Sequence, residues 1–178
     1  MHRKPLLELL RNYRETWPAE IEMADRLIDF VTGNPDCFER SLAIGHVTGS
    51  AWLVNAAGTH VLLTHHRKLD MWLQLGGHAD GNADIADVAR SEALEESGLE
   101  GIVPVTPEIF DIDIHRIPAR KSEAAHYHHD IRFALQATGG EGYIVSDESH
   151  DLAWVEIARL ADVTTEPSML RMAEKWLS

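Results

Sequence analysis

The sequence has a single cysteine, Cys37, among its 178 residues, so a disulfide within the chain is excluded. A protein without disulfides suits a reducing compartment, and we expect it in the cytoplasm. No apolar run approaches the roughly 20 residues that a membrane-spanning helix needs. The first ten residues, MHRKPLLELL, are too short and too charged for a signal peptide. We therefore expect no targeting segment and no membrane contact.

Positive charge is also scarce. The chain carries 16 Lys and Arg against 29 Asp and Glu, which gives a formal net charge of −13. Such a surface repels nucleic-acid polymers and acidic lipids. An acidic protein that acts on phosphates would need metal ions to bring the two together. Hydrophobic residues make up 44% of the chain, which is ordinary for a folded domain of this length.

The order of hydrophobic patterns predicts an α/β protein. Residues 4–34 show helical spacing, and we interpret 1–35 as an N-terminal helical extension of a main domain that covers 36–178. Within that domain the composition favours strands over 44–55, 60–66, 71–75, 103–117, 127–137 and 152–155, with helices over 84–97 and 167–177. A mixed sheet with the first of these helices on one face and the second on the other would be an α/β/α sandwich.

The most informative stretch is GGHADGNADIADVARSEALEESGL, from Gly76 to Leu99. Its second half has helical composition, and Glu92, Glu95 and Glu96 share one helix face because they are spaced i, i+3 and i+4. Like charges at this spacing repel by a few tenths of a kcal/mol, on the order of 0.3 per pair. The only cation in this helix is Arg90. A hard cation such as Mg²⁺ or Mn²⁺ would convert the repulsion into a binding site.

This stretch resembles the signature of the Nudix hydrolases, which reads Gly, five residues, Glu, seven residues, then Arg-Glu-U-x-Glu-Glu-x-Gly-U, with U bulky and apolar. With Gly77 as the first glycine, the matching positions are Glu92, Glu95, Glu96, Gly98 and Leu99. Two positions depart from the signature: Ala83 replaces the first Glu, and Ser91 replaces the Arg that helps to orient the following Glu. Arg90 lies about 100° further round the helix than that position, and Asp80 in the preceding loop could restore negative charge near Ala83.

The resemblance implies a Nudix-type α/β/α sandwich and hydrolysis of a diphosphate bond in a nucleoside diphosphate linked to another moiety X. It also implies that Mg²⁺ or Mn²⁺ binds to the three helix glutamates and to the backbone carbonyl of Gly76, and that Glu92 or a metal-bound water network supplies the base. A further acidic ligand often precedes a late Trp-containing strand in this family. Here SDESHDLAWV offers three acids, of which we select Glu148. The substrate, a small diphosphate compound of nucleotide origin, is otherwise open.

Histidines are the second unusual feature, with 11 in the chain. Strand alternation places Asp111, Asp113 and His115 on one face, and His126, His128, Asp130 and Arg132 on another. Two such polar faces could line one cleft, where His and Arg would suit phosphate recognition or a second metal. The candidate substrate-binding residues on these faces are therefore His115, His126, His128 and Arg132.

Two alternatives stay open. The losses at Ala83 and Ser91 could indicate a Nudix-like module that binds a nucleotide without cleaving it, although the stacked glutamates argue for catalysis. Isopentenyl-diphosphate isomerases carry Cys-Gly-His before a similar helix, and Gly76-Gly77-His78 resembles that segment without its thiol. We therefore favour the hydrolase over the isomerase. The isomerase resemblance still adds His78 to the candidate substrate-binding residues, as a side chain that would contact metal or diphosphate. A homodimer is compatible with the resemblance, and the oligomeric state is open.

Overall fold

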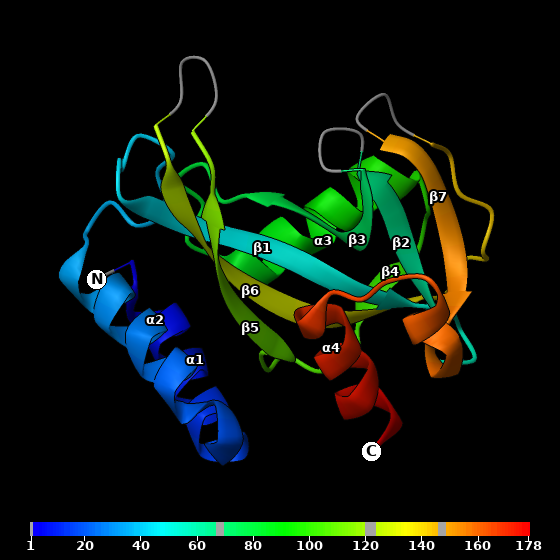
Figure 1. Ribbon diagram of the computed structural model, residues 1–178, viewed down its shortest axis with the longest axis horizontal. Coiled ribbons are helices and arrows are strands. Elements are labelled where there is room, and N and C mark those ends of the chain that lie inside the picture. Colours follow the sequence, from blue (N-terminus) through cyan, green and yellow to red (C-terminus); the bar gives the residue numbers. More distant parts are fainter. Residues whose placement is uncertain (1, 67–69, 120–123, 146–148) are drawn as a thin grey trace.

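The computed structural model describes residues 2–66, 70–119, 124–145 and 149–178, and its elements are labelled in Figure 1. The helices are α1 (Lys4–Thr16), η1 (Pro18–Glu20), α2 (Ile21–Gly33), α3 (Ile85–Ser97), η2 (Ile157–Asp162) and α4 (Pro167–Leu177). The strands are β1 (Gly45–Val54), β2 (His60–His66), β3 (Met71–His78), β4 (Ile102–Pro104), β5 (Asp111–Ile117), β6 (His126–Ala137) and β7 (Ser149–Glu156).

The single strand expected over 103–117 is wrong, because this segment forms two strands, β4 and β5. Both pair antiparallel with β6, β4 near its end and β5 along its first half. Pro104 is the last residue of β4 and Pro107 follows shortly after it. Proline has no N–H to donate to a sheet ladder, which explains the interruption. The other predicted elements occur close to their expected positions.

The sheet is mixed, in the order β4-β6-β1-β3-β2-β7, with β5 also paired to β6. The central strand β1 runs parallel to β6 over its whole length and antiparallel to the last part of β3. The first part of β3 pairs instead with β2. This topology brings the beginnings of β1 and β6 beside the end of β3, a corner that the site uses.

Helices cover both faces of the sheet, as the sequence predicted. In Figure 1, β1 crosses in front of α3, while α4 lies on the near side. The α3 face is packed closely: a Cβ on Gly49 of β1 would come within 3.0 Å of the Ile85 carbonyl oxygen and of Val88. On the α4 face, Trp52 of β1 packs in a second apolar cluster with Met169 and Met172. The fold is therefore an α/β sandwich around a mixed sheet.

The helices α1 and α2 pack together beside the sheet (Figure 1). Their buried side chains belong to the same hydrophobic core as α3 and the facing strands; they are Leu6, Leu10, Tyr13, Ala24, Leu27 and Val31. In α2, Leu27 takes the buried position while Ile28 is half-buried. Within the described residues, no helix is long and apolar enough to cross a membrane.

Candidate active site and histidine cluster

The acidic helix α3 is defined at both ends by its sequence. The side chain of Asp84 caps the N-terminus by accepting a hydrogen bond of 3.1 Å from the Asp87 N–H. Gly98 ends the helix in the left-handed conformation, with φ of 64°. The three glutamates lie in the last turns of this helix, and the sequence prediction of the helix is confirmed.

Two of the glutamates are seated against the glycine pair of β3. The backbone N–H of Gly76 donates a hydrogen bond of 2.8 Å to Glu96 Oε1. A Cβ on Gly77 would lie 2.3 Å from the carboxylate of Glu92, so the glycine makes room for that carboxylate. Glu92 and Glu96 are half-buried, whereas Glu95 is exposed. Gly77 therefore has a physical role here, which is to let the Glu92 carboxylate approach the backbone of β3.

This donor set suits a hard divalent cation. Carboxylate oxygens and a backbone carbonyl are the ligands that Mg²⁺ and Mn²⁺ prefer. The space over Gly77 that a Cβ would fill is occupied by the Glu92 carboxylate, which brings anionic oxygens next to the strand. Glu148, the further acid selected from the sequence, lies outside the described residues.

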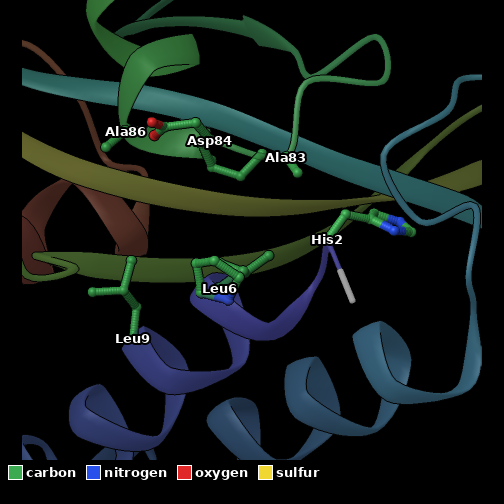
Figure 2. A pocket seen from close by; sticks show the side chains of 8 residues that line it. His2, Leu6, Leu9, Ala83, Asp84 and Ala86 are labelled. Carbon is green, nitrogen blue, oxygen red and sulfur yellow. The ribbon is translucent and has the colours of Figure 1, made fainter.

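The two departures from the signature lie in different surroundings. Ala83 packs, partly buried, against the hydrophobic core, and it lines an apolar recess of about 330 Å³ between α1 and the start of α3, shown in Figure 2. The other lining residues are His2, Pro5, Leu6, Leu9, Asp84, Ile85 and Ala86. Ser91 is half-buried on α3. An apolar residue at position 83 is thus explained by the helix α1 that faces it.

Asp80 does not replace the missing glutamate. Its carboxylate is paired with the guanidinium of Arg40 through two hydrogen bonds. The hydrogen bond from Arg40 lowers the pKa of Asp80 below its ordinary value. The negative charge that the sequence suggested for the site is therefore neutralised by a local partner.

The face of the sheet opposite α3 carries the histidines. His46 of β1 is paired in register with His128 of β6, and His78 of β3 lies opposite Thr48, two residues further along β1. The ring centroids of His46 lie 5.0 Å from His78 and 4.9 Å from His128. His126 adjoins this group, with its ring 5.0 Å from that of His46. His78, His126 and His128 thus lie close together around His46.

His115 of β5 borders the cluster, with its ring 5.4 Å from that of His128. Its Nδ1 lies 3.1 Å from Oδ2 of Asp113, two residues away on the same strand face. The predicted alternation along β5 is confirmed, because Ile112 on the opposite face is fully buried in the core. His129, the neighbour of His128, also faces the core and stacks on Phe30 with centroids 3.6 Å apart.

Two rings of the cluster, those of the buried His46 and the half-buried His128, are held in the neutral form. Burial, together with smaller contributions from neighbouring histidines, lowers the pKa of His46 to about 4 and that of His128 to about 2. His46 is only 3% exposed. Within the described part of the chain, neither ring nitrogen of His46 has a hydrogen-bond partner, nor has the buried Nε2 of His128.

Arg132, one of the predicted substrate-binding residues, lies buried in an ion network rather than in an open cleft. It is 2% exposed, and its Nε donates a hydrogen bond of 2.7 Å to Asp130 while its Nη1 donates one of 3.0 Å to Asp111. Burial opposes its charge, but Asp130, Asp111 and Asp113 keep the pKa of Arg132 above its ordinary value. Alternation along β6 placed it on the correct face, but the sequence did not reveal that α4 covers that part of the face.

Asp111 is the centre of this buried ion network. It is fully buried and accepts hydrogen bonds from two residues of α4, Arg171 at 2.8 Å and Lys175 at 2.7 Å. Lys175 also pairs with Glu20 of η1 at 2.6 Å. The network therefore connects the sheet, the C-terminal helix and the N-terminal helices.

Solved structures share this fold. An Ap4A hydrolase from C. elegans aligns with a TM-score of 0.59 and 15% identity over 74% of this chain and 94% of its own. The E. coli dihydroneopterin triphosphate pyrophosphohydrolase aligns with a TM-score of 0.58 and 15% identity over 72% of this chain and 92% of its own. A hydrolase of the Nudix family from Clostridium perfringens aligns with a TM-score of 0.54 and 24% identity over 74% of this chain and 95% of its own. No protein-family model matches the sequence, and no curated protein does. The chain therefore has the fold of the Nudix hydrolases.

Proposed function

We propose that the protein is a metal-dependent hydrolase that cleaves a diphosphate bond in a nucleoside diphosphate linked to another moiety. The observation that carries this proposal is the seating of Glu92 and Glu96 against Gly76 and Gly77 of β3. The shared fold supports it, because the similar structures include enzymes named as hydrolases and a pyrophosphohydrolase.

Each residue of the proposed site has a separate task. Glu92, Glu95, Glu96 and the Gly76 carbonyl would hold Mg²⁺ or Mn²⁺, with Glu148 as a further proposed ligand. The bound ion would supply charge neutralisation on the phosphates and an acidified water. Glu92 would accept the proton of the attacking water. The Gly76 N–H fixes the Glu96 carboxylate from the strand side.

The hydrolytic step is assigned to these carboxylates alone. A Cβ on Gly77 would point to Glu92, whereas a Cβ on Gly76 would meet Ser50 on the other side of β3. His78 therefore points away from α3 by strand alternation. Because the histidines and the glutamates lie on opposite sides of β3, direct contact of one diphosphate with both groups is not part of the proposal.

The position and the raised pKa of the only thiol in the chain, that of Cys37, disfavour isomerase chemistry. Cys37 is fully buried in the core, between α2 and β1. Burial raises the pKa of its thiol to about 11, so the thiolate is scarce at neutral pH. Isomerase chemistry needs the thiol at the position of Gly76, and Cys37 lies in a different region of the sequence.

The test is turnover with Mg²⁺ or Mn²⁺ on a panel of nucleotide sugars, dinucleoside polyphosphates, oxidised nucleotides and non-nucleotide diphosphates, with direct detection of the nucleoside monophosphate product. We expect Glu96→Gln to lower turnover by about 100-fold or more, since it removes charge at the developing transition state. The variant should fold, because the amide oxygen of Gln can still accept the bond from Gly76. Glu100→Gln, an exposed residue just beyond α3, is the matched control.

Equal turnover by the wild type and Glu96→Gln would overturn the proposal. Nucleotide binding without cleavage of any compound would also overturn it, in favour of a binding module.

A further inference from the structure

Three adjacent strands present histidines at one corner of the sheet. His46 and His128 are direct register partners on β1 and β6, and His78 ends β3 on the other side of β1. Because hydrogen-bonded strands hold all three residues, their backbone positions are fixed on rigid elements rather than on loops. The cluster is thus preorganised by the fold.

The ligand geometry fits a single ion. One ring nitrogen from each of His46, His78 and His128 lies within 4.8 Å of the others. Zinc binds imidazole nitrogen at about 2.0–2.1 Å in tetrahedral geometry, which puts ligand nitrogens about 3.4 Å apart. Small side-chain rotations close this difference. Among the described residues, this trio is the group of three His, Cys, Asp or Glu side chains whose ligand atoms lie this close together.

The buried nitrogens lack protein partners. Both ring nitrogens of His46 and the Nε2 of His128 make no hydrogen bond within the described part of the chain. Buried polar atoms are normally satisfied, and an exception calls for an unseen partner such as an ion. A coordinated cation would satisfy lone pairs on both rings.

The carboxylate of Asp130 is engaged by other residues. Asp130, two residues beyond His128, accepts hydrogen bonds from Thr48 at 2.8 Å, from Ser50 at 2.7 Å and from Arg132 at 2.7 Å. The histidine cluster therefore offers nitrogen ligands to a metal ion, and Asp130 offers no free carboxylate. Imidazole ligands favour zinc, cobalt, nickel and copper over Mg²⁺ and Mn²⁺.

We propose that His46, His78 and His128 bind a divalent transition-metal ion of the zinc type, at a site separate from the α3 carboxylates. Three protein ligands leave a fourth position for water or an anion, as in zinc sites that bind small molecules. His126 and His115 border this position, with their rings 5.2 Å and 5.4 Å from that of His128. The proposal does not depend on the hydrolase activity proposed above.

The test uses the full chain, stripped of metal with a chelator and titrated with Zn²⁺ by calorimetry in the absence of nucleotide. We expect one zinc ion per chain, undisturbed by millimolar Mg²⁺. His78→Ala and His128→Ala should each weaken zinc binding by about 100-fold or more. X-ray absorption of the zinc-loaded wild type should show a nitrogen and oxygen shell at about 2.0–2.1 Å without sulfur.

Two variants serve as matched controls. His60→Ala removes a histidine of β2 that is not part of the cluster, and Glu96→Gln removes a ligand of the proposed hydrolytic site. Neither should change zinc affinity. Absence of stoichiometric zinc binding, or equal affinity in the wild type and both cluster variants, would overturn the proposal. Loss of zinc binding in Glu96→Gln would also overturn it. The absorption measurement needs no variant, so it decides the matter even if a histidine variant fails to fold.

Discussion

The polar face of the sheet opposite α3 has two ends that differ in one respect. At the α4 end, the buried carboxylate of Asp111 is matched by Arg132, Arg171 and Lys175. At the other end, His46 is buried and His128 is half-buried, and buried ring nitrogens of both have no hydrogen-bond partner among the described residues. Both ends are strongly polar. The Asp111 end lies on β5 and β6, and the histidine end lies on β1, β3 and β6. The difference indicates that the first end holds the fold together, whereas the second is prepared for a ligand.

The largest effect should come from disrupting the ion network around Asp111. Asp111→Ala leaves three cations without their shared carboxylate, and we expect a loss of about 3–5 kcal/mol in the free energy of unfolding. Urea denaturation of the purified chain measures it. Asp162→Ala breaks the exposed pair with Arg159 and should cause no measurable change. A similar small loss in both variants would show that the buried network does not stabilise the fold.

The two faces of β3 can be separated by a pair of glycine substitutions. A Cβ at Gly76 would lie 2.8 Å from the backbone carbonyl of Gly49, so Gly76→Ala should cost about 1–3 kcal/mol of stability. A Cβ at Gly77 meets only the movable carboxylate of Glu92. Gly77→Ala should therefore preserve most of the stability but lower turnover about tenfold or more, because it displaces that carboxylate. Thermal unfolding and turnover measured side by side distinguish them, and equal effects on both properties would contradict the assignment.

Substitution in the histidine cluster should change the stability in the opposite direction to substitution of Asp111. In metal-free protein, His46→Leu replaces an unpaired buried imidazole with an apolar side chain. We expect unfolding free energy to stay constant or rise by about 1 kcal/mol. Zinc should stabilise the wild type and leave this variant unaffected. A loss of several kcal/mol in metal-free His46→Leu would show that His46 has a structural role like that of Asp111.

The smallest effect is expected from restoring the signature. Ala83→Glu combined with Ser91→Arg should change turnover less than about threefold, because Ala83 packs against α1 and the site is assembled without those groups. A steady-state assay on the substrate found by the panel measures it. A large increase in rate would show that the site has not compensated for the two losses.

Much of this arrangement was predictable from local sequence. The helical composition of this stretch and the spacing of Glu92, Glu95 and Glu96 predicted α3 and its acidic face, since helix periodicity is a local property. Strand alternation also placed Arg132 on the polar face. The end of β4 was missed, although Pro104 carried a signal for it.

The sequence by itself determined the acidic helix, the glycine pair before it and the mixed α/β pattern, because each depends on residues close together in the chain. Only the tertiary structure decided that Arg132 lies in an ion network and that His46 joins His78 and His128. Those outcomes depend on strand order, which puts β1 between β6 and β3, and on the docking of α4 over one end of the sheet. A polar residue on a strand can be assigned to a face from its alternation. Whether it meets solvent, a counter-charge or another histidine depends on contacts between segments far apart in sequence.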